Sequence, residues 1–158
     1  MSPESVRAAY ERVRGEVGPS VTVVVATKYV SLQDMAVLVE AGVEVVGENR
    51  AQDLERKHAE YGDAFRWHFI GHLQSNKVKV VNERCELVHS LGSESAARRL
   101  EVPALVEVNL GRVQAAIDAG GSARYSPAIN DGKAIRFHVA VKIGIGAYVD
   151  AVTVGEGL

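Results

Sequence analysis

The sequence predicts an α/β fold of parallel strands alternating with helices, followed by a segment of a different kind. Over about the first 110 residues, short β-branched apolar runs alternate with segments whose apolar residues recur at helical spacing. The loops between them are short and often marked by glycine, which is typical of βα units with right-handed crossovers. Beyond Leu110 the pattern changes, and apolar and polar residues come to alternate strictly.

The chain begins with a predicted helix. Ser2 and Pro3 suit its N-cap and first helical positions, and apolar residues then recur at helical spacing as far as Val17. Residues 21–26 follow as a short β-branched run, of the kind that a strand buried on both faces needs. These two elements begin the α/β pattern.

A second helix is predicted after the first strand. Ser31 and Asp34 have the spacing of a capping box, which favours a helix start at this point. Its expected apolar stripe contains Met35, Leu38 and Val39. A glycine follows this stripe and is expected to end the helix.

The remaining βα units follow in order. The predicted strands are 43–46, 66–71, 87–91 and 103–110, and the predicted helices are 50–61, 75–82 and 93–100. Ligands of parallel α/β folds collect outside the carboxyl ends of the strands. We therefore look for functional residues directly after each strand.

The segment beyond Leu110 has its own pattern. Residues 112–119 allow one more helix, and a loop rich in Gly, Ser, Pro and Asn follows over 120–132. Apolar and polar residues alternate from 135 to 145, which indicates a half-exposed and usually antiparallel strand. Residues 148–154 are its candidate hairpin partner.

Length and composition limit the class of protein. A chain of 158 residues suits a single α/β domain over 1–158, with βα units in 1–110 and a divergent tail in 111–158. A complete (β/α)8 barrel typically needs about 200 residues or more. The net charge of −2 gives no reason to expect nucleic-acid or anionic-membrane partners. We expect a cytoplasmic protein that is a monomer or a weak homo-oligomer.

Cys85 is the one cysteine of the chain. An intramolecular disulfide is therefore impossible, and a zinc site built from cysteines is not expected. No nucleophile motif accompanies this residue. We interpret Cys85 as a small buried hydrophobe.

Lys28 follows the first predicted strand almost directly. A lysine at the rim of an apolar strand is partly desolvated, and desolvation favours the neutral amine that Schiff-base chemistry requires. In the alternative interpretation, the apolar stem of Lys28 lies along the loop and its amine simply reaches water.

The second predicted strand leads into Gly47, Glu48, Asn49 and Arg50. Gly47 allows a close backbone approach, and Asn49 offers both a hydrogen-bond donor and an acceptor. Asn49 is therefore a candidate binding residue. From the spacing alone, it could equally be the N-cap of the following helix.

The third predicted strand and its loop form the densest polar stretch. His68 lies within the apolar strand, where a histidine is usually a satisfied core or rim residue. His72 follows on the loop. An i,i+4 histidine pair binds metal on a helix, and this segment is strand and loop, so no metal site is expected. Glycine-rich phosphate fingerprints are absent from the sequence.

Several segments, in this order, resemble the pyridoxal phosphate homeostasis proteins, a family related to the barrel domain of alanine racemase. The segments are VATK at 25–28, GENR at 47–50 and WHFIGHLQSNK at 67–77, with VHSL at 88–91 and LVEVN at 105–109 resembling the fourth and fifth strands. The third string is long and highly specific. The resemblance covers about residues 1–110.

The resemblance implies a (β/α) barrel of the TIM or alanine racemase type, here shortened or incomplete, with a β-hairpin-like C-terminal segment. It implies pyridoxal 5'-phosphate (PLP) held as a Schiff base on Lys28. Asn49 matches a position that lines the family's pocket, and His68 is a further cofactor-binding candidate. The family is implied to buffer PLP and deliver it to PLP-dependent apo-enzymes, without robust catalysis.

Two alternatives to this function remain open at the level of sequence. One is a ligand-inert α/β module that associates with itself through exposed strand edges. The other is a racemase-like PLP enzyme. The chain also departs from the family, because its Ser-rich phosphate-binding turn is missing and residues 142–148 only faintly resemble the second phosphate-binding segment. No phosphate-binding residues are therefore assigned.

Overall fold

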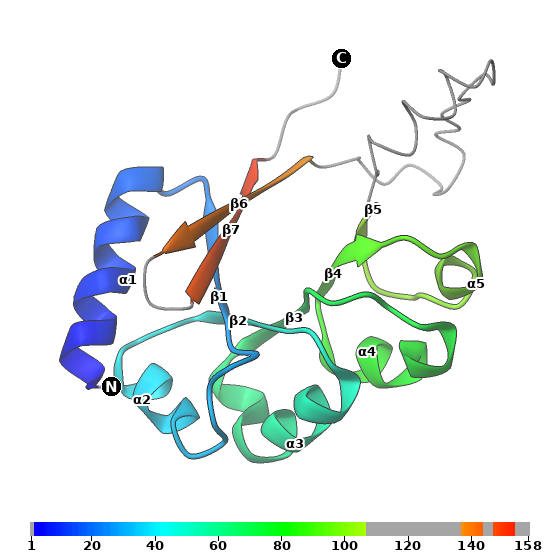
Figure 1. Cartoon of the computed structure of the whole chain (residues 1–158), viewed down its shortest axis with the longest axis horizontal. Helices are drawn as coiled ribbons and strands as arrows, with labels where there is room; N and C mark the ends of the chain where they lie inside the picture. The colour runs from blue at the N-terminus through cyan, green and yellow to red at the C-terminus, as the bar shows by residue number, and fades with distance from the viewer. Residues whose placement is uncertain (1, 107–136, 144–146, 154–158) are drawn as a thin grey trace.

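The computed structural model describes residues 2–106, 137–143 and 147–153 (Figure 1). The predicted helix over 112–119 and the predicted loop over 120–132 lie outside the described residues. The described residues therefore comprise the βα units and a C-terminal pair of strands.

Helices and strands alternate over the first part of the chain, which confirms the predicted βα units. The helices are α1 (Pro3–Val17), α2 (Met35–Glu40), α3 (Ala51–Tyr61), α4 (Val78–Arg84) and α5 (Glu94–Ala97), with short 3-10 helices η1 (Gly62–Ala64) and η2 (Ser75–Lys77). The strands are β1 (Thr22–Ala26), β2 (Val45–Glu48), β3 (Arg66–Phe69), β4 (Leu87–Leu91), β5 (Ala104–Val106), β6 (Phe137–Ile143) and β7 (Ala147–Thr153).

The described strands form one sheet in the order β5-β4-β3-β2-β1-β7-β6. Strands β1 to β5 pair in parallel, whereas β7 pairs antiparallel with both β1 and β6. The sequence therefore predicted correctly both the parallel βα part and the C-terminal hairpin. Within the described strands the sheet is open, because β5 and β6 are its two edges.

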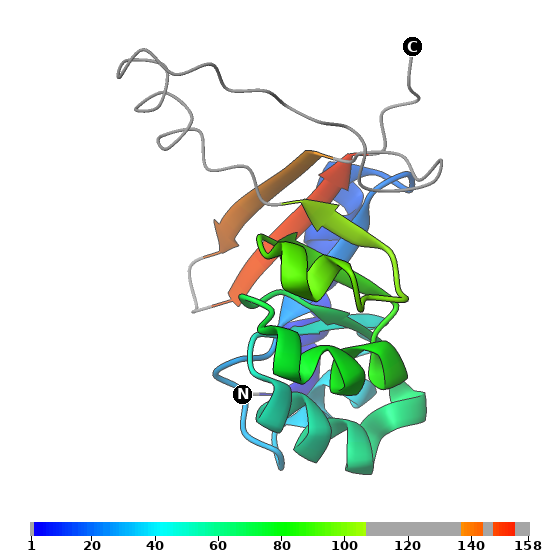
Figure 2. The same cartoon turned by 90° about the vertical axis from the view of Figure 1, so that its right-hand side faces the viewer.

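The helices lie in an arc around one side of the sheet, as Figures 1 and 2 show. This placement follows from topology, because right-handed crossovers between parallel strands in chain order all return over the same face. The result is a half-barrel sheet covered on its outer side by helices. We call the opposite side of the sheet its inner face.

Helix α1 begins and ends as its sequence predicts. The side-chain oxygen of Ser2 accepts a hydrogen bond from the backbone N–H of Ser5, and Pro3 occupies the first turn. Gly18 ends the helix with a φ of 81°, a conformation that glycine adopts without steric cost. Tyr10 and Val13 face the interior. No helix among the described residues is long and apolar enough to cross a membrane.

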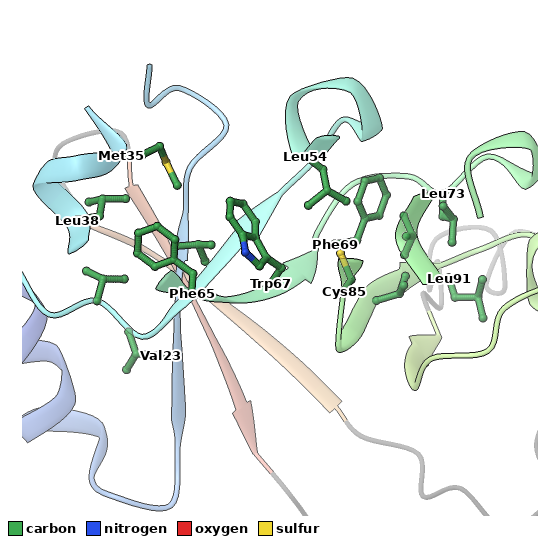
Figure 3. Close-up of a cluster of buried hydrophobic side chains, with 14 of the residues drawn as sticks. Val23, Met35, Leu38, Leu54, Phe65, Trp67, Phe69, Leu73, Cys85 and Leu91 are labelled. Atoms are coloured by element: carbon green, nitrogen blue, oxygen red, sulfur yellow. The ribbon is translucent and has the colours of Figure 1, made fainter. Parts of the chain in front are cut away.

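The hydrophobic core lies between the sheet and its helices (Figure 3). Its largest fully buried apolar side chains include Trp67 and Phe69 on β3, Met35 on α2 and Leu54 on α3. Cys85 lies in this cluster, and burial raises the pKa of its thiol to about 12. The interpretation of Cys85 as a buried hydrophobe is therefore confirmed.

Two predictions about the second βα unit need correction. Val39 was expected in the apolar stripe of α2, but it is 42% exposed, whereas Met35 and Leu38 are buried. Strand β2 lies two residues further along than predicted, at Val45–Glu48 in place of 43–46. It extends because the carboxylate of Glu48 has a buried partner, described below, and so does not end the strand.

Candidate functional site

The strand registers align one row of residues across the inner face. Ala26 pairs with Gly47, and Gly47 pairs with His68. Neighbouring residues at one level of a parallel sheet direct their side chains to the same face. The row lies on the side opposite the helices, since Val46 and Trp67, next to it in sequence, belong to the core beneath the helices.

Lys28 and Asn49 lie one level nearer the carboxyl ends of the strands. Lys28 comes two residues after Ala26, in the turn that follows β1, and Asn49 comes directly after the end of β2. Both side chains are half-buried. Nζ of Lys28 lies 5.2 Å from the ring centroid of Tyr29, which is 80% exposed. The three sequence-predicted site residues thus lie at or near the carboxyl ends of the neighbouring strands β1, β2 and β3.

Asn49 is not the N-cap of the following helix. Helix α3 starts at Ala51, so Arg50 occupies the N-cap position. The alternative interpretation of Asn49 as a helix cap is therefore wrong. Asn49 lies directly after the carboxyl end of β2 and is half-buried.

His68 forms a buried pair with His89 of β4. Nδ1 of His68 lies 2.9 Å from Nε2 of His89, and the two side chains are 4% and 6% exposed. One ring N–H donates to the other ring, so Nε2 of His68 is the nitrogen left for a ligand. Burial, together with a smaller contribution from the nearby Arg66, lowers the pKa of His68 to about 4.

The low pKa of His68 predicts a loss of stability in acid. As the pH falls from about 6.5 to about 4, the unfolded chain takes up a proton that His68 in the folded chain does not. The free energy of unfolding should therefore fall by about 3 kcal/mol across this window and be fully restored above it. Urea titrations at several pH values measure this dependence.

A matched pair of variants separates His68 from other titrating groups. His68→Gln should lose most of the dependence, whereas His72→Gln, at an exposed position, should keep it. Equal pH dependence in both variants would assign the effect to other residues.

Gly71 allows the ends of β2 and β3 to approach each other closely. A Cβ atom at Gly71 would lie 2.0 Å from the carbonyl oxygen of Asn49 and 2.7 Å from its Cα. The carbonyl of Gly71 also accepts a hydrogen bond from the Ser90 hydroxyl at 2.7 Å. Since the obstructing atoms belong to the backbone, a side chain here would have to displace Asn49.

We expect Gly71→Ala to lower the free energy of unfolding by about 1–3 kcal/mol or more, because the backbone of Asn49 must move away. Denaturation in urea measures the change. The matched control is Gly15→Ala on the exposed side of α1, where a Cβ meets nothing within 4 Å. That control should be stabilised by about 0.5–1 kcal/mol. Equal effects of the two substitutions would contradict the close approach.

A buried ion pair lies between α3 and the carboxyl ends of β1 and β2. Nζ of Lys57 lies 2.5 Å from Oε1 of Glu48, with side chains only 2% and 0% exposed. Lys57 also donates to the carbonyl of Thr27 at 2.7 Å, and the Thr27 hydroxyl donates to the same Oε1 at 2.7 Å. Oε2 of Glu48 has no hydrogen-bond partner among the described residues. We call this group the Thr27–Glu48–Lys57 cluster.

Two buried residues near the candidate site, Lys57 and His89, were not predicted from the sequence, although each left a signal there. Ala51, Leu54 and Lys57 are the buried positions of α3, at a spacing of three. A lysine in line with an apolar stripe indicates a buried partner of opposite charge. His89 lies within an apolar strand, as His68 does.

The described residues hold no group of three or more His, Cys, Asp or Glu side chains placed to bind a metal ion.

Curated relatives share the sequence of the βα part. No protein-family model matches the chain. A pyridoxal phosphate homeostasis protein from Aquifex aeolicus is 34% identical over 119 residues, which cover 68% of this chain and 51% of the relative. One from Corynebacterium glutamicum is 38% identical over 81 residues, covering 51% of this chain and 36% of the relative. The chain thus spans about half the length, or less, of these relatives.

A solved structure shares the fold. PipY from Synechococcus elongatus PCC7942, solved with PLP bound, has 26% sequence identity and a TM-score of 0.62. The match covers 72% of this chain and 63% of PipY. The structure of PipY without PLP matches over the same shares, with a TM-score of 0.60. The matched part of the chain is therefore similar to the pyridoxal phosphate homeostasis proteins, as its motifs predicted.

Proposed function

We propose that this chain binds PLP as a Schiff base on Lys28 and serves in PLP homeostasis without robust catalysis. The observation that carries the proposal is the placement of Lys28 just beyond the carboxyl end of β1, with Asn49 directly after the neighbouring β2 and His68 on β3. Parallel α/β folds bind ligands at this end of the strands. The names of the relatives and the PLP bound to PipY support the choice of cofactor.

The residues present at this end of the sheet fit PLP chemically. The Lys28 amine would attack the aldehyde carbon, so that a C–N bond forms and water leaves. Asn49 offers a donor and an acceptor for polar groups of the cofactor, and His68 offers its remaining ring nitrogen. When bound, PLP supplies an electron sink. The chain's contribution is to hold the aldehyde and orient the ring.

The state of His68 supports a carrier in preference to a catalyst. A racemase-like reaction needs a side chain that gives and takes a proton near neutral pH. The pKa of His68 is lowered to about 4 by burial, and its Nδ1 is engaged by His89. His68 is therefore neutral at physiological pH and is a poor general acid. PLP-dependent apo-enzymes are the proposed recipients of the cofactor.

The proposed architecture is a shortened (β/α) barrel of the alanine racemase type in a single domain. The chain order of β1 to β5 and the helices along one side support it. The hairpin β6–β7 extends the sheet beside β1, at one of the places where further barrel strands would pair. The cytoplasmic location and the weak self-association expected from the sequence remain predictions.

An absorption spectrum of the purified chain, with and without added PLP, tests the proposal. A Schiff base should give a visible band that saturates as PLP is added. Incubation of the PLP-loaded chain with amino acids then separates carrier from enzyme, and we expect no turnover. No band, together with an oligomer that grows with concentration, would favour the ligand-inert module instead. Amino-acid turnover would favour a racemase-like enzyme.

A further inference from the structure

The Thr27–Glu48–Lys57 cluster lies beside the backbone that carries Lys28. Lys57 lies in the middle of α3. Its side chain is buried, and its ammonium lies at the ends of β1 and β2. There it meets two acceptors, Oε1 of Glu48 at 2.5 Å and the carbonyl oxygen of Thr27 at 2.7 Å. The second contact is the informative one, because Thr27 and Lys28 share a peptide bond.

Every polar group of Thr27 is engaged. Its N–H donates to the carbonyl of Gly47 at 2.9 Å, and its hydroxyl donates to Glu48. Its carbonyl accepts from Lys57 and also from the backbone N–H of Val30, at 2.8 Å. The turn over residues 27–30 is thus fixed from both sides, and a shift of Thr27 would break several hydrogen bonds together.

We propose that Lys57 is a positioning residue for Lys28. Its ammonium, held in place by Glu48, fixes the Thr27 carbonyl and with it the backbone that carries Lys28. This inference rests on the proposed function, since it assigns Lys28 as the residue that binds PLP.

The energetics of buried ion pairs favour such a role over a purely stabilising one. Taking two charges out of water costs about as much as their attraction returns, and apolar residues of similar volume often stabilise a core as well or better. Glu48 even keeps one buried oxygen without a partner among the described residues. What apolar residues cannot supply is a directed donor to the Thr27 carbonyl.

The variant that tests the proposal is Glu48→Gln/Lys57→Met. It removes both charges and so leaves no lone buried ion, and it deletes the donor to the Thr27 carbonyl. The matched control is Glu94→Gln/Arg98→Gln, which removes an exposed ion pair of 2.5 Å on α5. Cooperative unfolding in urea first establishes that both variants fold.

Two measurements then report on position. The first is amide hydrogen exchange at Val30, whose N–H donates to the Thr27 carbonyl; this measurement needs no cofactor. The second is the affinity for added PLP and the pH midpoint of its Schiff-base band. The cluster variant should exchange at Val30 at least about tenfold faster and bind PLP at least about tenfold more weakly, with a shifted pH midpoint. The control variant should match the parent chain in both measurements.

A folded cluster variant that matches the parent at Val30 and in its PLP titration overturns the proposal. If that variant does not unfold cooperatively, Thr27→Val decides, since it removes the hydroxyl bonds to Glu48 and to the Gly47 carbonyl and should speed Val30 exchange by about threefold. Parent-like exchange in Thr27→Val then overturns the proposal. A parent chain that forms no Schiff base contradicts the proposed function instead, and the exchange measurement still decides whether Lys57 fixes the turn.

Discussion

Lys57→Met is expected to lower the free energy of unfolding by about 3–5 kcal/mol. The substitution leaves the carboxylate of Glu48 fully buried with the Thr27 hydroxyl as its one remaining partner among the described residues. A lone charge in such a place loses its solvation by water without compensation. Since domains of this size are stable by only about 5–15 kcal/mol, the loss is a large fraction of the total. Urea denaturation near neutral pH measures it.

Two control variants test whether the loss of stability comes from the unpaired buried carboxylate of Glu48. Glu48→Gln/Lys57→Met should recover most of the lost stability, because it removes the lone carboxylate as well. Lys79→Met should change stability by less than about 0.5 kcal/mol, because Lys79 is 88% exposed and lies 3.9 Å from Glu83. A Lys57→Met variant as stable as Lys79→Met would show that the buried pair does not exist as described.

Lys28→Ala is expected to abolish the Schiff-base band that the parent chain gives with PLP. The amine is the group that forms the covalent bond, and Lys28 is the lysine that follows β1 directly, whereas the Lys57 amine is buried in an ion pair. Alanine should leave the fold intact, because Lys28 is half-buried at the end of β1 and the polar groups of Thr27 keep their partners. Absorption titrations and urea denaturation of the same samples provide the measurement.

Lys79→Ala is the matched control for this substitution, since it removes an exposed lysine on α4. It should give the parent's band and the parent's affinity. A band of unchanged intensity and affinity in Lys28→Ala would place the cofactor elsewhere or exclude a covalent bond.

Local signals in the sequence predicted much of the fold. The boundaries of α1 follow from Ser2, Pro3 and Gly18, whose capping roles depend only on their near neighbours. The hairpin of β6 and β7 follows from strict alternation, which marks a strand with unlike faces. In each case the residues that decide the structure lie within a few positions of one another.

The errors arose where a distant residue decides. Glu48 looked like the end of a strand, because a charged side chain is costly to bury, yet Lys57 pairs with it from the next helix. Val39 looked like a core residue of α2, but the helix is short and turns that position outward. Neither outcome can be derived from the local pattern alone.

The candidate site shows the same division. Lys28 and Asn49 could be named from sequence because both follow strands, and parallel strands end at one edge of a sheet. The contact between His68 and His89 could not be predicted without the register of β3 and β4. That register brings Nδ1 of His68 to 2.9 Å from Nε2 of His89. The contact between Lys57 and Thr27 depends on how α3 packs against the sheet, and the sequence does not show that packing.

The central claim is that Lys28 is the residue that binds PLP. Borohydride reduction of the PLP-loaded chain, followed by proteolysis and mass spectrometry of the peptides, tests it most directly, because reduction makes the C–N bond permanent. If Lys28 binds PLP, we expect a single reduced label on the peptide that contains Lys28. A label spread over other lysines, or a Lys28 peptide that stays unmodified while PLP is bound, would contradict it.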